Sequence, residues 1–116
     1  DMPPLQVCVQ INISEESSKS GVTPSEAMDL CQLIQELPRL KLRGLMSIPE
    51  PKESIEQQRA DHRMLKTIFQ EIQKHRRSPD FDTLSMGMSS DMEAAILEGS
   101  TIVRIGTAIF GQRTYL

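Results

Sequence analysis

Two hydrophobic periodicities alternate along this chain, one typical of buried strands and the other of amphipathic helices. Continuous apolar runs predict strands over residues 5–13, 40–48, 82–86 and 101–105. Between them, apolar residues spaced three and four positions apart predict helices. This order, strand–helix repeated and ending on a strand, requires a parallel sheet with right-handed crossovers. The predicted fold class is therefore α/β.

Capping residues mark the predicted helix boundaries. Thr23 precedes a proline and stands three residues before Glu26, which is the pattern of a capping box. Similar signals are Pro38 after the first helix, Ser54 with Gln57 before the second, and Ser90 with Glu93 and Gly99 around the third. The predicted buried stripes are Ala27, Leu30, Cys31, Ile34 and Leu37, then Met64, Leu65, Ile68, Phe69 and Ile72.

Composition excludes several classes of protein. The net charge of −3 does not support nucleic-acid binding, which requires a basic face, and no apolar run approaches the ~18–20 residues of a membrane span. Cys8 and Cys31 lack metal-ligand spacing, so we interpret both as small buried residues of a reduced, cytoplasmic protein. The chain begins with Asp1 and enters a strand almost at once, which we interpret as a chain cut inside a larger fold, with removal of a start by processing as the alternative.

Two glycine-containing turns follow the last two predicted strands. Gly87 and Ser89 belong to the first turn, and Gly106 and Thr107 belong to the second. Free backbone N–H groups point outward where a strand turns into a helix, and glycine lets a ligand approach the backbone closely. Two such turns on neighbouring parallel strands predict a phosphate site. Ordinary turn glycines with helix-capping hydroxyls remain the alternative.

Arg104 lies inside the last predicted strand. Because side chains alternate along a strand, Arg104 is expected to face the side of the sheet away from the helices. A buried guanidinium is costly without a partner, so it requires either a structural carboxylate or a ligand acceptor. Asn12 and Ser47 are polar within strand runs and either face a pocket or bond to neighbouring backbone. Asp91 and Glu93 are explained by helix capping, and His62 has no second metal ligand nearby.

Four segments together resemble the YggS/PROSC family of pyridoxal-phosphate-binding proteins, often called pyridoxal phosphate homeostasis proteins. They are SKSG at residues 18–21, GLMSIP at 44–49, LSMGMSSDMEAAI at 84–96 and VRIGTAIFG at 103–111. The resemblance covers about residues 5–113. The family's fold resembles the N-terminal barrel of alanine racemase. It implies that residues 1–116 are the C-terminal half of a TIM (β/α)8 barrel, with the N-terminal half absent.

The same resemblance implies residue roles. Met88 and Ser89, with Gly106 and Thr107, would hold the phosphate of pyridoxal 5′-phosphate, and Arg104 would donate to the pyridine nitrogen. Arginine stays protonated, so it favours an unprotonated ring nitrogen and weakens the ring as an electron sink. Such a site suits holding or delivering the cofactor better than amino-acid chemistry.

Family members hold the cofactor as a Schiff base on a lysine near the end of the first barrel strand, and this chain starts beyond that point. Lys19 is the nearest substitute, but its polar loop indicates a surface or rim residue. We therefore expect the chain alone to bind pyridoxal phosphate weakly or not at all. We also expect it to self-associate or to be completed by a missing N-terminal segment, because the outer strands of half a barrel expose unpaired backbone.

The leading functional hypothesis is a non-catalytic, cytoplasmic module of pyridoxal phosphate homeostasis. A racemase-like enzyme is the main alternative, and it would need a base such as Tyr115, the only tyrosine. A half-barrel that binds other phosphate ligands and a structural fragment without a ligand are two further alternatives.

Overall fold

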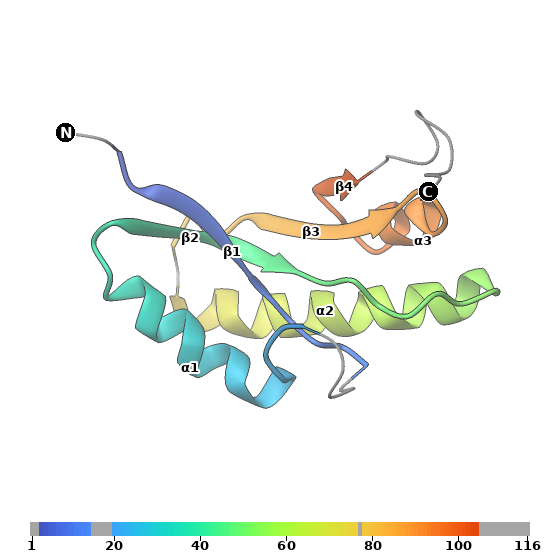
Figure 1. The fold of residues 1–116 in the computed structure, drawn as a ribbon, viewed down its shortest axis with the longest axis horizontal. Helices are drawn as coiled ribbons and strands as arrows, with labels where there is room; N and C mark the ends of the chain where they lie inside the picture. Colours follow the sequence, from blue (N-terminus) through green and yellow to red (C-terminus); the bar gives the residue numbers. More distant parts are fainter. Residues whose placement is uncertain (1–2, 15–19, 77, 105–116) are drawn as a thin grey trace, which may run out of the picture.

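Four parallel strands form one sheet in the order β1-β2-β3-β4, and the helices between them pack on one face (Figure 1). The computed structural model describes residues 3–14, 20–76 and 78–104. The elements are β1 (Leu5–Gln10), α1 (Pro24–Gln35), β2 (Leu40–Met46), α2 (Ile55–Arg76), β3 (Thr83–Met88), α3 (Met92–Leu97) and β4 (Ile102–Arg104). This alternation confirms the predicted α/β class. Neighbours in sequence are neighbours in the sheet, which is the strand order of a (β/α)8 barrel.

The strand ends differ from the prediction at the carboxyl edge of the sheet. β1 ends at Gln10, and Ile11 then makes an isolated bridge with Val22. β3 continues to Met88, so Gly87 and Met88 belong to the strand rather than to the turn after it. The turn is consequently shorter than the sequence indicated.

The capping residues are confirmed for the first two helices and corrected for the third. The backbone N–H of Thr23 donates to Glu26 Oε1 at 3.1 Å, and Gln57 N–H donates to Ser54 Oγ at 3.1 Å. At α3 the N-cap is Asp91 and not Ser90. Gly99 follows the C-cap with φ +97°, a left-handed conformation that glycine adopts readily.

The hydrophobic core lies between the sheet and the helices. In it, α1 packs on β1 and β2, α2 on β2 and β3, and α3 on β3 and α2. Phe69 stacks on Phe81 with ring centroids 4.8 Å apart. Further core residues, all less than a tenth exposed, are Val9, Ile11, Ile13, Ala27, Leu42, Leu45, Leu65, Ile72, Leu84, Met86 and Ala95.

Three side chains predicted to be buried prove to be exposed. Leu37 lies beyond the last residue of α1, and Met64 lies one position off the buried stripe of α2, so neither reaches the core. Cys8 points to the opposite face of β1 from Val9 and is exposed. Cys31 is fully buried, as predicted, and burial raises the pKa of its thiol to about 11.

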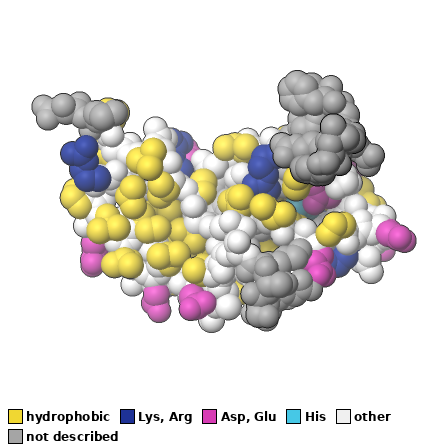
Figure 2. All heavy atoms as spheres, viewed as in Figure 1, with side chains coloured by type: hydrophobic (Ala, Val, Ile, Leu, Met, Phe, Trp, Pro, Cys, Tyr) yellow, Lys and Arg dark blue, Asp and Glu magenta, His cyan; other side chains and the backbone are white. Residues whose placement is uncertain are grey.

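The face of the sheet away from α1 and α2 is not covered by any described element. An open hollow of about 300 Å³ lies on it, lined by Gln6, Val7, Cys8, Arg43, Thr83 and Ile102. Hydrophobic side chains also gather on the surface over β1, β2 and α1 (Figure 2), where Leu5 is 67% and Leu33 55% exposed. β1 stands first in the strand order and pairs only with β2 among the described strands, so it is an edge strand, and apolar side chains are exposed beside it. None of the helices in the described part of the chain has the length and apolar character needed to cross a membrane.

Candidate functional site

The carboxyl ends of β2, β3 and β4 meet at a cavity of about 170 Å³. Met88 and Arg104, the last residues of their strands, are register partners and both line it. The other lining residues are Ile48, Pro49, Pro51, Lys52, Gln58, Gly87, Ser90 and Asp91. Two residues that the sequence singled out, 16 positions apart, thus contribute to one cavity at the strand ends.

Arg104 reaches from β4 across β3 towards the end of β2. Its Nη2 donates to the Ser47 carbonyl at 2.9 Å, and its Nη1 lies 3.4 Å from Ser85 Oγ. Its Nε is buried and has no hydrogen-bond partner among the described residues. Both partners of this guanidinium are neutral, and no carboxylate forms an ion pair with it in the described part of the chain. Its positive charge is therefore available to an anionic or electron-rich acceptor, which would offset the cost of burial.

Ser47 is the second polar residue at this place. It follows β2, its side chain is fully buried, and its hydroxyl has no partner within residues 3–14, 20–76 and 78–104. Its backbone N–H donates to the Ser85 carbonyl at 3.2 Å, which extends the β2–β3 pairing by one residue. The Ser47 hydroxyl makes no bond to neighbouring backbone in the described chain, Ser47 is not among the residues that line the cavity, and its contact with Arg104 is through its carbonyl. Asn12 instead lies in the loop after β1, where its N–H donates to the Val22 carbonyl at 2.7 Å.

The turn after β3 is held by Asp91. Met88 N–H donates to Asp91 Oδ1 at 2.7 Å, and Asp91 N–H donates back to the Met88 carbonyl at 3.2 Å. The second carboxylate oxygen, Oδ2, lies 2.9 Å from His62 Nε2. The Asp91 side chain makes no capping bond to the N–H groups of α3, so helix capping does not explain its carboxylate. It ties the end of β3 to α2.

His62 is a functional candidate that the sequence reasoning missed. Its side chain is fully buried and faces Asp91. A signal was present, because residue 62 stands three positions before Leu65 and seven before Phe69, on the buried face of the helix. A histidine at a buried position requires a polar partner, which the sequence could not identify.

Gly87 is required by packing and also lines the cavity, so the expectation that it lets a ligand approach the backbone stays a prediction. Its φ is +103°, and a Cβ atom there would lie 2.5 Å from the Ala95 Cβ and 3.2 Å from Val103 Cγ1. The missing side chain therefore makes room for α3 against β3 and β4.

The remaining predicted site residues are placed only in part. Ser89 is half-buried and lies in the turn between Met88 and Asp91. Gly106 and Thr107 lie outside the described residues, as do Lys19 and Tyr115. The structure thus brings Met88, Arg104 and the Ser89 turn to one cavity.

Ion pairs hold α3 against α2 beside this cavity. Glu98, which follows α3, accepts from Arg63 Nη2 at 3.1 Å and from Arg59 Nε at 2.7 Å. Hydrogen bonds from Arg63 and then Arg59 lower the pKa of Glu98 to about 2. Its carboxylate therefore stays ionised at neutral pH and keeps the two helices together.

Comparison with known proteins places this geometry in context. Residues 1–114 match the family described as "Alanine racemase, N-terminal domain". The chain is 55% identical over 115 residues to the pyridoxal phosphate homeostasis protein of Vibrio cholerae, with 99% of this chain and 48% of that protein covered. It is 53% identical over 115 residues to the protein of the same name from Escherichia coli K12, with the same coverage. The chain thus spans about half the length of the curated relatives it matches.

Solved structures share the fold. PipY of Synechococcus elongatus with PLP bound superposes with a TM-score of 0.80 at 28% identity, over 94% of this chain and 50% of PipY. The same protein without PLP gives a TM-score of 0.82 at 33% identity, over 93% and 50%. A protein from Bifidobacterium adolescentis, described as unknown, gives a TM-score of 0.83 at 40% identity, over 93% of this chain and 44% of that one.

Proposed function

Because the chain belongs to the alanine racemase N-terminal domain family, we propose that it supplies the phosphate-binding half of a pyridoxal 5′-phosphate site. The protein would act in cytoplasmic pyridoxal phosphate homeostasis, as a carrier or buffer of the cofactor. One observation carries the proposal: Arg104 is half-buried at the carboxyl ends of the strands with a fully buried Nε, lacks an anionic partner among the described residues and lines a cavity beside Met88. Ligand sites of parallel barrels lie at this end.

The residues present fit this cofactor in chemistry. The phosphate would contact the turn of Met88 and Ser89. Gly106 and Thr107, which lie outside the described residues, are proposed as further phosphate contacts. Arg104 would donate to the pyridine nitrogen, which fits a guanidinium whose Nε has no partner in the described chain. The cavity of about 170 Å³ is smaller than the ~300–1,000 Å³ of a complete small-molecule pocket. The described residues would therefore hold only part of the cofactor.

The proposed role is storage and delivery. Bound pyridoxal phosphate supplies an aldehyde and an aromatic ring that can accept electrons. Arg104 cannot be deprotonated in a protein, so it would keep the ring nitrogen unprotonated and a weak electron sink. Ser47 and Ser85 would hold the guanidinium in place through the acceptors that it already contacts.

We further propose that residues 1–116 are part of a barrel completed by a segment that carries the cofactor-binding lysine. The sheet face away from α1 and α2 has no described cover, and apolar Leu5 lies exposed on the edge strand β1. Such a face and edge favour association with a further part of a barrel. The relatives' length, about twice the part matched here, is consistent with this proposal.

Equilibrium dialysis of the intact gene product against pyridoxal phosphate tests the proposed function. We expect saturable binding of one cofactor per chain, strong competition by pyridoxine phosphate and weak competition by pyridoxal, which lacks the phosphate. Equal displacement by sugar phosphates would support the alternative of a general phosphate-ligand site. Binding of pyridoxal as tight as that of pyridoxal phosphate would contradict a phosphate site.

Racemase-like activity is the alternative, and the match to an alanine racemase domain is the observation that favours it. Exchange of the α-proton of L-alanine in deuterated water separates the two functions. We expect no exchange above that produced by free pyridoxal phosphate. Exchange that saturates with L-alanine would establish catalysis and refute the carrier proposal.

A further inference from the structure

A buried histidine–aspartate pair connects the middle of α2 to the turn after β3. His62 Nε2 lies 2.9 Å from Asp91 Oδ2, while Asp91 Oδ1 accepts the Met88 N–H at 2.7 Å. The histidine side chain is fully buried, and that of Asp91 is 16% exposed. Both carboxylate oxygens therefore have a partner, and the orientation of the carboxylate is set from two sides.

This pair does more than attach α3 to α2. Glu98 already joins the two helices through Arg59 and Arg63, at 2.7 and 3.1 Å. Leu65, Phe69 and Ile72 on the same face of α2 are apolar. An apolar residue at position 62 would avoid the cost of burying His62 Nδ1, which has no partner in the described chain. Among the described residues, the hydrogen bond to Asp91 is therefore the one interaction of the imidazole that an apolar side chain at position 62 could not replace.

We infer that His62 and Asp91 are positioning residues for the turn of residues 88–91, which in the proposed function contacts the cofactor phosphate. His62 orients the Asp91 carboxylate, and the carboxylate orients the backbone of Met88. The turn is thereby held at the mouth of the cavity that Arg104 lines. Donors on both oxygens also draw the negative charge of Asp91 away from a bound anion. This inference depends on the proposed function only for the identity of the ligand.

Substitutions at His62 in the intact gene product test the inference. His62→Leu removes the donor, and we expect it to weaken pyridoxal phosphate binding about tenfold, the typical value of one charge-assisted hydrogen bond. His62→Gln keeps an N–H group near the same position, and we expect it to restore most of the affinity. The matched control is His75→Leu, because His75 lies on the exposed end of the same helix and its side chain is 61% exposed.

A second readout does not require the cofactor. In the ligand-free protein, hydrogen exchange of the Met88 amide should be accelerated by His62→Leu and unchanged by His75→Leu, because only the former releases the Asp91 carboxylate. If the wild-type protein binds no pyridoxal phosphate, the proposed function fails, and the Met88 amide still decides the inference. A purely structural histidine would lower the urea midpoint while affinity and Met88 exchange stay at wild-type values.

Wild-type affinity and Met88 exchange in His62→Leu would overturn the positioning role. A His62→Gln variant as impaired as His62→Leu would overturn it as well. If His62→Leu does not fold, His62→Phe replaces it, because a phenyl ring fills the buried volume and lacks the donor. The same two measurements then apply, with weaker cofactor binding and faster Met88 exchange as the supporting result.

Discussion

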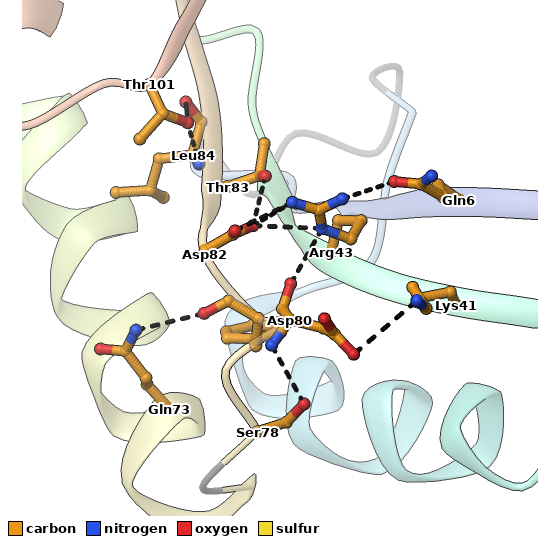
Figure 3. A network of polar contacts seen from close by, with 11 residues as sticks. Gln6, Lys41, Arg43, Gln73, Ser78, Asp80, Asp82, Thr83, Leu84 and Thr101 are labelled. Carbon is orange, nitrogen blue, oxygen red and sulfur yellow. Dashed lines mark hydrogen bonds and ion pairs between the residues drawn. The ribbon is translucent and has the colours of Figure 1, made fainter.

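Two arginines of the sheet have very different surroundings: Arg43, midway along β2, contacts groups at the amino ends of β1 and β3, whereas Arg104 is the last residue of β4. Every nitrogen of Arg43 has an acceptor: Nη2 contacts both oxygens of Asp82 at 2.8 Å, Nη1 contacts Gln6, and Nε contacts the Asp80 carbonyl at 3.0 Å (Figure 3). At the carboxyl end, Arg104 contacts only neutral acceptors and has a buried Nε without a partner among the described residues.

The difference distinguishes Arg43, a structural cation, from Arg104, the proposed binding cation. Arg43 is neutralised by Asp82, whose pKa is lowered by the Arg43 hydrogen bonds, so this network is complete without a ligand. Arg104 lacks such a carboxylate, so a further acceptor there would be stabilising. The amino ends of parallel barrel strands generally support stability and the carboxyl ends function, and the proposed role of Arg104 agrees with that division.

The largest expected effect tests how tightly the carboxyl end of β3 packs against α3. Gly87→Ala should lower the free energy of unfolding by about 2–4 kcal/mol, because it combines a left-handed backbone with overpacking against Ala95. Urea unfolding of the intact gene product measures this change. Gly99→Ala is the matched control, since a Cβ there would meet only the flexible Lys66 side chain, and we expect about 1 kcal/mol. Equal losses in the two variants would contradict tight packing at Gly87.

The second effect tests the proposed binding role of Arg104, on which the comparison of the two arginines depends. Arg104→Met should weaken pyridoxal phosphate binding about 10- to 100-fold, because it removes a charged donor from the cavity. Its free energy of unfolding should stay the same or increase, because a partly buried charge without a carboxylate partner is lost. Isothermal titration and urea unfolding check the two expectations. Affinity within twofold of wild type would show that Arg104 is not a ligand donor.

The third effect concerns Arg43, where we expect a substitution to change stability but not cofactor affinity. Arg43→Met should lower the urea midpoint slightly, because Asp82 and Gln6 lose their donor in a partly exposed network. Pyridoxal phosphate affinity should not change, since Arg43 does not line the cavity that Arg104 lines. If affinity fell as much as in Arg104→Met, the two arginines would not have separate roles.

The smallest effect concerns pH. The folded pKa of Glu98 is about 2, against an ordinary value of 4.5, because Arg63 and Arg59 donate to it. Since the folded pKa is lowered, its stabilisation is fully present above pH 4.5 and is lost as pH falls towards 2. Urea midpoints measured across this range should fall less steeply in Glu98→Gln than in wild type. Asp82→Asn gives the same comparison at the amino end, and unchanged slopes in both variants would refute these assignments.

Much of this arrangement could be predicted from local patterns. The alternation of strands and helices, the caps at Thr23 and Ser54, and the inward position of Arg104 each depend on residues close together in the chain. Periodicity and capping act over one or two turns of helix or a single strand, so a linear sequence contains that information. The resemblance to the homeostasis proteins likewise rested on short ordered segments, and the comparisons confirmed it.

Other features depended on contacts between distant segments. His62 and Asp91 are 29 positions apart and meet because α2 packs against β3 and α3. Gly87 is required by its left-handed backbone and by the packing of Ala95 and Val103 against it. Cys8 is exposed because no described element covers its face of the sheet. Local periodicity thus determines which elements form, whereas the partners of buried polar groups are decided by how those elements pack, because hydrogen bonds act over about 3 Å in space irrespective of separation along the chain.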